Sequence, residues 1–504
     1  MFATMSSAVV EGVDGHAVTV EVHVSQGLPG YTLVGMPDAS CRESRDRVRS
    51  AILSSGLRWP QRRVTINLAP SSLRKNGAAL DLPIALGILA ASDQIEPATL
   101  NGLGAIGELG LDGSLRAVGG VVCLAGAIVA KKIITPVDGA AEAAVTRPGA
   151  VLAAHSLGQV VEALRQGDLP LVRVTPSRVD RSATPGADLS DVRGQPLARW
   201  ALEVAAAGGH HLLMVGPPGS GKTMLASRLV GLLPDLDGEQ ALLTTRVHSA
   251  AGVALPVGGL VRRPPLRAPH HGASMVSLVG GGTAALRPGE ISCAAGGVLF
   301  LDELGEFAPT ALDALRQPLE EGVVRVARAA RTATLPARFL LVAAMNPCPC
   351  GEGGVTGRCR CSEAARARYT RRLSGPLLDR FDIRVEVRPP AADVLLNGAN
   401  EESTAEVATR VEKVRLAAAE RGVTCNAQLP PDRLDEVAPL TAEAKAALRA
   451  ALESNDLTGR GLTRIRTVAR TIADLVGADV IDDQIVGSAL SMRARPVSVL
   501  GASR

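Results

Sequence analysis

Aromatic side chains are the residues that this sequence has least of. The 504 residues include 5 Phe, 2 Tyr and 2 Trp, although apolar residues together reach 46%. The hydrophobic cores must therefore be built from Ala, Val, Leu and Ile. Proteins that bind single-stranded nucleic acid by stacking need exposed aromatic rings, so any contact with nucleic acid has to use charge and backbone amides instead.

Long apolar runs, a leader segment and a strong charge imbalance are missing as well. No uncharged run reaches the roughly 20 apolar residues that cross a bilayer; residues 117–130, for example, are interrupted by glycines. Residues 1–4 lack the basic start and apolar segment of a secretory signal. We therefore expect a cytoplasmic protein with no membrane partner. The net charge of +4 is too small to predict nucleic-acid binding by itself.

The cysteines are too few for a disulfide framework, but half of them are clustered. The chain has 8 cysteines, and four lie close together as Cys348-Pro349-Cys350 and Cys359-Arg360-Cys361. Four thiolates at this spacing can bind one tetrahedral Zn²⁺, and reduced, unliganded thiols are the alternative. For the adjacent His270 and His271, packing or a hydrogen bond is favoured over metal binding, because neighbouring side chains on an extended segment point opposite ways.

The pattern of apolar residues changes along the chain and predicts three folded domains. Residues 1–170 alternate short apolar strands with helical stretches such as 81–91, which predicts a mixed α/β domain. Residues 171–190 are polar and rich in Pro and Ser, which predicts a linker. Residues 191–392 contain buried-strand patterns typical of a parallel sheet, and residues 393–504 have the helical spacing of a bundle.

Residues 216–223 read Gly-Pro-Pro-Gly-Ser-Gly-Lys-Thr between a predicted strand and a predicted helix. This is the phosphate-binding pattern G-x-x-x-x-G-K-[ST], in which glycines let backbone N–H groups face phosphate at a helix N-terminus. The lysine brings positive charge to the β- and γ-phosphates, and the threonine is a ligand of Mg²⁺. We therefore expect ATP and Mg²⁺ to be bound by Gly216, Gly219, Ser220, Gly221, Lys222 and Thr223.

Polar residues end the next two apolar strands. Asp302 and Glu303 follow residues 298–301, where the aspartate would hold Mg²⁺ and the glutamate would polarise the attacking water. Asn346 follows residues 339–344 and is placed to orient that water. Considered one at a time, Asp302 and Glu303 could be solvated acids at a strand end, and Asn346 could belong to an ordinary Asn-Pro turn. Because they follow a phosphate loop in the same chain, they together predict the catalytic site of a P-loop ATPase of the AAA+ kind.

Further sequence blocks occur in a fixed order, at 191–195, 268–271, 280–282, 288–291, 315–320, 346–351, 374–382 and 469–475. Together with the phosphate loop, this set resembles the YifB/ComM family of magnesium-chelatase-like AAA+ ATPases over nearly the whole chain. The resemblance implies a hexameric ring, an insertion around 267–288, a β-hairpin before residues 339–344, and a helical lid at the C-terminus.

The resemblance also assigns roles to two arginines. Arg380, in the Leu-Asp-Arg-Phe-Asp block, matches the arginine finger that reaches the γ-phosphate of a neighbouring subunit. Arg460, in Thr458–Leu462, matches the lid arginine called sensor 2, which is expected to touch the phosphate of its own subunit. Cations on both sides would stabilise the charge on the transferring phosphoryl group. Without the resemblance, a surface salt bridge is the simpler interpretation of either arginine.

The hairpin is visible in the sequence itself, with strands at 323–327 and 332–335 around a basic turn. In ring motors such hairpins point into the pore, where Arg325, Arg328 and Arg331 would follow the phosphate backbone of DNA. A solvated charged hairpin remains the alternative interpretation.

The stretch 73–83 resembles the Lon-protease fold, of the ribosomal S5 type, that RadA-type recombination proteins share. Ala78 and Ala79 occupy the region where a Lon-type peptidase needs its serine, and residues 118–122 offer no lysine, which argues against peptidase activity. The leading hypothesis is an ATP-driven ring motor that acts on single-stranded or branched DNA, as in branch migration. The alternative is a chelatase-like ATPase subunit that remodels a partner protein.

Overall fold

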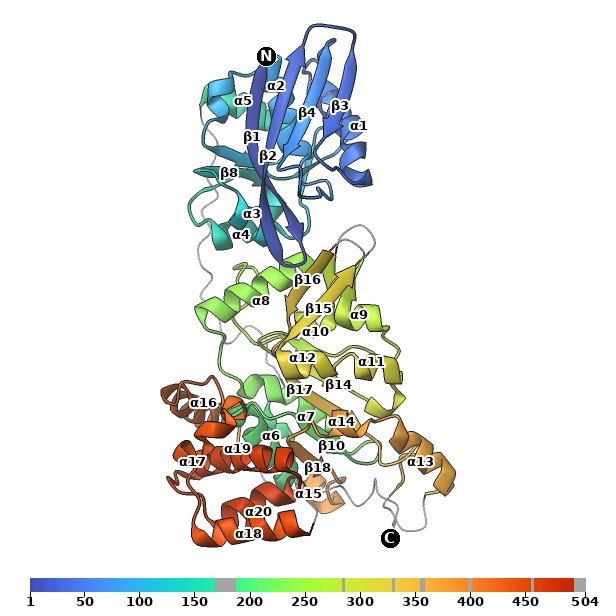
Figure 1. The fold of residues 1–504 in the computed structure, drawn as a ribbon, viewed down its shortest axis with the longest axis vertical. Helices are drawn as coiled ribbons and strands as arrows, with labels where there is room; N and C mark the ends of the chain where they lie inside the picture. The colour runs from blue at the N-terminus through green and yellow to red at the C-terminus, as the bar shows by residue number, and fades with distance from the viewer. Residues whose placement is uncertain are drawn as a thin grey trace.

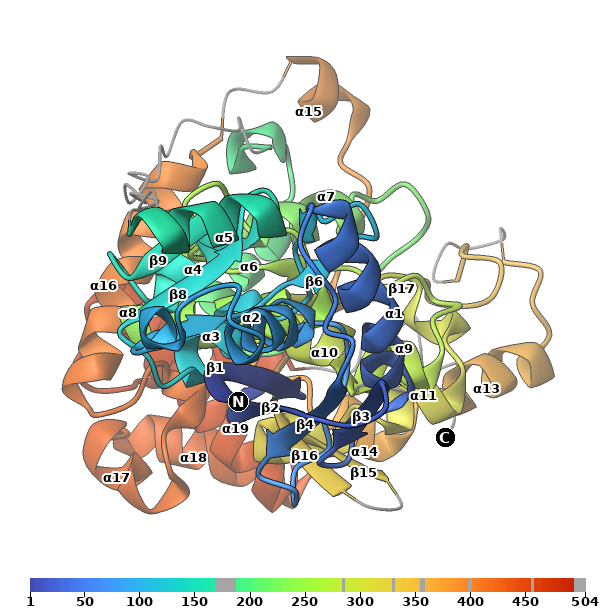
Figure 2. The ribbon, with the colours of Figure 1, turned by 90° about the horizontal axis from the view of Figure 1, so that it is seen from above.

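The computed structural model describes residues 1–167, 187–282, 286–328, 331–353, 359–397, 401–454 and 457–493, with the backbone alone at 327, 328, 331 and 332. The N-terminal α/β elements lie at one end of the molecule, a parallel sheet with its helices lies in the middle, and the C-terminal helices lie at the other end (Figure 1). Viewed from above, the N-terminal elements cover the middle part (Figure 2).

The N-terminal elements are built on a seven-stranded mixed sheet with the strand order β3-β4-β2-β1-β5-β8-β9. The two longest strands, β1 and β2, form an antiparallel hairpin, whereas β5, β8 and β9 pair in parallel. The mixed α/β pattern expected from the sequence is confirmed. The strands are β1 Phe2–Glu11, β2 Asp14–Ser25, β3 Gly30–Val34, β4 Arg63–Ala69, β5 Leu103–Ala105, β6 Glu108–Leu109, β7 Leu115–Arg116, β8 Lys132–Pro136 and β9 Val151–Ala154.

The helices of this part differ in how deeply they are buried. All residues of α2, Asp81–Ala91, are buried, because a helix that is apolar on every side must be enclosed on every side. Its bounds agree with the helix predicted at 81–91. The other helices cover the sheet and are α1 Ala39–Ser54, α3 Val121–Ala127, α4 Val137–Thr146 and α5 Leu157–Gln166.

The middle of the molecule contains a five-stranded parallel sheet with the order β11-β14-β17-β10-β18. Every residue of β10, β14 and β17 is buried, which confirms the buried strands predicted from the apolar runs. Since all the strands are parallel, their carboxyl ends meet at one edge. The strands are β10 Leu212–Val215, β11 Leu266–Arg267, β14 Val298–Leu301, β17 Leu340–Met345 and β18 Ile383–Glu386.

Helices and short elements surround this sheet. α13 lies at the periphery in both views (Figures 1 and 2). Two short strands, β12 Gly280–Gly281 and β13 Arg287–Pro288, lie in the insertion expected around 267–288. The helices are α6 Pro196–Gly208, α7 Lys222–Leu229, α8 Gly238–Ala251, α9 Met275–Val279, α10 Glu290–Cys293, α11 Pro309–Asp313, α12 Arg316–Glu321, α13 Glu363–Arg371, α14 Gly375–Leu378 and α15 Ala392–Asn397.

The C-terminal elements form the predicted helical bundle and share a hydrophobic core with the sheet. Residues of the bundle, of α6 and of β10 belong to the same buried cluster. Within the described residues, no helix is both long enough and apolar enough to cross a membrane. The helices are α16 Thr404–Glu420, α17 Leu434–Val437, α18 Ala442–Glu453, α19 Gly459–Val476 and α20 Asp483–Ser491.

The end of the predicted linker differs from the expectation. Residues 168–186 lie outside the described residues, but residues 189–191 form a short 3₁₀ helix. Leu189 is 1% exposed, and its N–H donates to the Thr404 hydroxyl at 2.8 Å. The folded part therefore begins before residue 191. The Leu189 side chain is buried in the hydrophobic core that the sheet and the C-terminal helices share.

Helix α8 joins the N-terminal sheet to the middle of the molecule. The Arg246 guanidinium donates to Asp14 at 2.8 Å and to the carbonyl of Val13 at 2.9 Å. The hydroxyl of Ser249 donates to Glu142 at 2.8 Å, and the N–H of Gly120 donates to the carbonyl of Ser249 at 3.0 Å. These contacts hold the β1–β2 turn and α3 against α8.

The predicted hairpin is present as β15 Val323–Arg328 and β16 Arg331–Pro336, paired from Val323↔Pro336 to Arg328↔Arg331. Its apolar face packs against the β1–β2 turn, since Val13 belongs to the same buried cluster as Val324 and Leu335. The β1–β2 turn therefore covers part of one face of the hairpin.

Candidate functional site

The phosphate loop leaves β10 at the carboxyl edge of the parallel sheet and enters α7. Gly219 and Gly221 have φ of +75° and +88°, and a Cβ added at Gly216 would lie 2.1 Å from the Val387 carbonyl oxygen. Only glycine fits these conformations and this close approach. The Gln195 amide donates to the carbonyl of Ser220 at 2.7 Å and so stabilises the loop. The sequence analysis assigned no role to Gln195.

Lys222 lies at the centre of this loop. Its ammonium group donates to the carbonyls of Gly216 and Pro217 at 2.8 Å each, and to the Asn346 side-chain oxygen at 3.3 Å. Burial lowers the pKa of Lys222, and the carboxylates of Asp302 and Glu303 oppose that shift. The structure thus places Asn346, which follows β17, beside the lysine.

Thr223 and Asp302 meet on the exposed side of the loop. The threonine hydroxyl donates to an Asp302 carboxylate oxygen at 2.7 Å. Because β14 and β10 end at the same edge, an acid after one strand reaches the first turn of the helix after the other. Hydroxyl and carboxylate oxygens are the hard ligands that Mg²⁺ prefers, so this pair fits the metal that the loop pattern implies.

Glu303 has an unusual backbone and an unexpected partner. It is one of three described residues other than glycine with positive φ, at 52°, a conformation that costs a side-chain-bearing residue about 1–2 kcal/mol. Its carboxylate lies 2.9 Å from Nδ1 of His271. Sequence reasoning favoured packing or a hydrogen bond for His271, but it did not identify Glu303 as the partner. The sequence signal that could have identified this partner is the position of His270 and His271. They follow β11, the strand that pairs with β14, and Glu303 follows β14.

Arg380 lies at the opposite edge of the sheet. The N–H of Asp382 donates to the carbonyl of His211, just before β10, which places this segment at the amino ends of the strands. The Arg380 guanidinium forms an ion pair with Glu320 and donates to the carbonyl of Pro376 at 3.3 Å. In its own chain, Arg380 is therefore a strand's length away from the phosphate loop, about 13 Å for four residues.

Arg460 is on the first turn of α19, and its charge acts on Arg380. Burial lowers the pKa of Arg380, and the nearby charges of Arg464, Arg460 and Arg316 lower it further. Arg464 also donates to the carbonyl of Arg380 at 2.7 Å. The expected contact of Arg460 with the phosphate of its own subunit stays a prediction.

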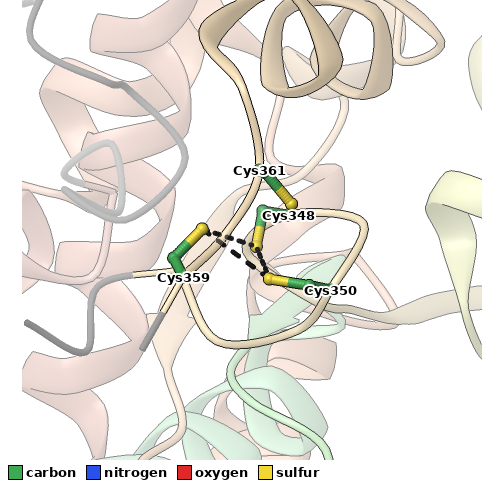
Figure 3. A group of neighbouring side chains, drawn as sticks. All are labelled: Cys348, Cys350, Cys359 and Cys361. Carbon is green, nitrogen blue, oxygen red and sulfur yellow. Dashed lines mark hydrogen bonds between the residues drawn. The ribbon is translucent and has the colours of Figure 1, made fainter. Parts of the chain in front are cut away.

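The four clustered cysteines meet in space (Figure 3). Their sulfur atoms all lie within 4.8 Å of one another, although they come from the loop after β17 and from the segment before α13. Arg366, on α13, donates to the sulfur of Cys359 at 3.1 Å. The spacing in the sequence predicted this cluster.

The hairpin arginines are only partly described. The Arg325 side chain is 55% exposed and pairs with Glu321 at 3.0 Å. Arg328 and Arg331 face each other at the end of the hairpin, and their side chains lie outside the described part of the structure. The basic tip therefore stays a prediction.

Comparison with family profiles covers most of the chain. Residues 188–395 match the profile described as magnesium chelatase, subunit ChlI, and residues 20–138 match the one described as subunit ChlI of Mg-chelatase. Residues 401–493 match magnesium chelatase, subunit ChlI C-terminal.

Comparison with individual proteins finds relatives of similar length. The chain is 45% identical over 489 residues to the competence protein ComM of Haemophilus influenzae, covering 96% of each chain. It is 44% identical over 486 residues to YifB of Escherichia coli, an uncharacterised protein, covering 96% of this chain and 95% of that one. A probable DNA helicase MCM9 of Oryza sativa subsp. indica is 26% identical over 173 residues, which is 34% of this chain and 21% of the rice protein.

Proposed function

Because this chain belongs to the YifB/ComM family of magnesium-chelatase-like ATPases, we propose that it is an AAA+ ATPase that acts on DNA. Its subunits form a ring, which the family resemblance implies is a hexamer. The single observation that carries the ATPase proposal is the meeting of Lys222, Asn346 and the Thr223–Asp302 pair at one edge of a parallel sheet. A phosphate loop, a pair of hard oxygen ligands and a polar strand-end residue are what ATP hydrolysis requires.

Each group at this edge has a distinct role in the proposed reaction. The Lys222 ammonium exchanges the carbonyls of Gly216 and Pro217 for phosphate oxygens. Thr223 and Asp302 would hold Mg²⁺, which offsets the charge of the β- and γ-phosphates when bound. Asn346 orients the attacking water.

Glu303 is the group proposed to polarise that water. Its contact with His271 uses one carboxylate oxygen, and the other oxygen can accept a hydrogen bond from that water. The strained backbone of Glu303 accords with this role, because strain of this kind gathers at catalytic positions.

Arg380 is proposed to act on a neighbouring subunit. It is too far from the phosphate loop of its own chain, and its partner Glu320 is more than half exposed, so the guanidinium can be released at a subunit boundary. Supplying this cation in trans makes hydrolysis depend on assembly. Arg460 is proposed to be the lid arginine that touches the phosphate of its own subunit, as the family resemblance implies.

Three further parts complete the proposal. The domains are residues 1–170, with a Lon-protease-like fold that lacks the catalytic serine and lysine, residues 191–392 as the ATPase core, and residues 393–504 as the helical lid. The cysteine cluster holds a structural Zn²⁺. DNA is the substrate of the motor, supported by the basic hairpin and by two relatives named as a competence protein and a probable DNA helicase.

The rate of ATP hydrolysis without DNA and with single-stranded, duplex or forked DNA tests the proposal. We expect basal hydrolysis and a clear stimulation by forked or single-stranded DNA. The alternative is a chelatase-like ATPase that remodels a partner protein, which the names of the matching family profiles favour. Hydrolysis that no DNA stimulates would favour that alternative, and an inactive wild-type protein would contradict both.

A further inference from the structure

The sulfur atoms of the cysteine cluster are spaced for one metal ion. Cys348 lies 3.3 Å from Cys350 and 3.7 Å from Cys359, and Cys350 lies 3.7 Å from Cys359. Four sulfurs bound tetrahedrally to Zn²⁺ at about 2.3 Å would be about 3.8 Å apart. All of the observed distances exceed the ~2.05 Å of a disulfide bond, and sulfurs this close leave room for a single ion rather than a multi-iron cluster.

A charged side chain next to the cluster favours a bound thiolate. Four thiolates around Zn²⁺ carry a net negative charge, and the Arg366 guanidinium donates to the sulfur of Cys359 at 3.1 Å. Outer hydrogen bonds of this kind orient metal ligands. Cys348 is 1% exposed whereas Cys350 is exposed, so the cluster is anchored in the core on one side and accessible to an ion on the other.

The first pair of cysteines is joined to the phosphate loop. Cys348 follows Asn346 by two residues. In the turn that contains Cys350, a Cβ added at Gly351 would lie 2.5 Å from the Pro218 ring. The turn that carries two of the sulfurs therefore packs directly on the phosphate loop.

The second pair is joined to the acidic end of β14. Cys359 and Cys361 come just before α13, and Tyr369 on that helix is 5% exposed. The Tyr369 ring packs on the turn after Glu303, since a Cβ at Gly305 would lie 2.4 Å from the ring. The Tyr369 hydroxyl also interacts with the backbone of Asn346, so α13 supports both strand ends of the ATP site.

We propose that Zn²⁺ bound by Cys348, Cys350, Cys359 and Cys361 clamps the loop after β17 to the start of α13, and thereby holds Asn346 and the phosphate loop in position. The metal site stands on the cysteine geometry alone, and its effect on the ATP site rests on the proposed function. The cysteines reach the ATP site through Pro218 and α13, so the zinc acts as a positioning element.

Metal content tests the binding site. Purified wild-type protein should contain about one Zn²⁺ per chain by elemental analysis, as expected for a Cys₄ site. Exchange with Co²⁺ should produce the visible absorption of tetrahedral thiolate coordination. A Cys348→Ser, Cys361→Ser double variant should lose the metal, and Cys425→Ser, a buried cysteine outside the cluster, should keep it. A metal-free wild-type protein, or iron in place of zinc, would overturn the proposal.

Hydrogen exchange tests the positioning role without relying on activity. Zinc is removed from the folded wild-type chain with a chelator and then restored, which avoids a variant that fails to fold. Removal should reduce amide protection in residues 212–229 and 340–347, and restoration should recover it. Protection in α2, at 81–91, should stay unchanged as an internal control. Equal protection of the phosphate loop with and without zinc would overturn the positioning role.

The two proposals fail in different ways. If the protein hydrolyses no ATP under any condition but the zinc-dependent protection of 212–229 is observed, the proposed function is wrong and the metal clamp stands. If hydrolysis and ATP affinity are unaffected by zinc removal, the ATPase proposal stands and the clamp is overturned.

Discussion

Replacing Arg380 with alanine tests whether this arginine acts on a neighbouring subunit, because the expected loss of ATP hydrolysis is larger than the expected loss of stability. In its own chain, Arg380 contributes an ion pair with Glu320 and a hydrogen bond to the carbonyl of Pro376 at 3.3 Å. Glu320 is 55% exposed, so its carboxylate returns to water when the arginine is removed. The ion pair with such a solvated partner contributes about 1 kcal/mol or less. Because the Arg380 side chain is only 9% exposed, the loss of its packed stem brings the expected destabilisation to about 1–3 kcal/mol.

The expected loss of activity is larger than the loss of stability. An arginine finger contributes about 10³–10⁵ to the rate of phosphoryl transfer, which is about 4–7 kcal/mol of transition-state stabilisation at 1.36 kcal/mol per decade. Arg380→Ala should therefore nearly abolish ATP hydrolysis, while the affinity for ATP changes little and the thermal midpoint falls only modestly.

The assay compares turnover, equilibrium ATP binding and thermal unfolding in three proteins. Arg388→Ala is the matched control, because Arg388 is 78% exposed and pairs with Glu386 at 3.3 Å; it should behave like the wild type. The Glu303→Gln protein, with its finger intact, is then mixed with Arg380→Ala. The mixture should recover part of the turnover, since each Glu303→Gln subunit supplies an arginine to the intact phosphate site of an Arg380→Ala neighbour.

Two results would refute this reasoning. Wild-type turnover by Arg380→Ala would show that the arginine has no part in the reaction. A lack of recovery in rings shown to contain both proteins would show that it does not act on a neighbouring subunit.

Other changes test the remaining groups. Lys222→Ala should weaken ATP binding, whereas Glu303→Gln should bind ATP and leave it nearly unhydrolysed; wild-type turnover by the second variant would contradict the assignment of the acids. Arg328→Ala or Arg331→Ala should lower the salt slope of DNA binding by about one unit per lost phosphate contact and spare basal hydrolysis, and an unchanged slope would argue against a DNA-binding hairpin. Burial lowers the pKa of His211 to about 4, so the unfolded chain binds its proton first as the pH falls, and the free energy of unfolding should decrease between about pH 6.5 and 4. His211→Asn should flatten that decrease in urea titrations, and an unaltered pH profile would exclude His211 as its cause.

Much of the local structure could be predicted because short-range physics determines it. The helix at 81–91 and the strand at 298–301 follow from their apolar patterns. The phosphate loop follows from glycines whose positive φ other residues rarely adopt. The hairpin at 323–336 and the cysteine cluster follow from alternation and ligand spacing, and both were predicted with their residues.

What the sequence by itself determined is therefore which segments fold locally and which side chains carry chemistry. Only the tertiary structure decided which of these side chains meet. The contact of His271 with Glu303, the position of Arg460 beside Arg380, and the burial of Leu189 against Thr404 join residues that are tens to hundreds of positions apart. No local pattern encodes such pairs, because the partner of a side chain depends on how whole helices and strands pack, and that packing is a sum over the entire core.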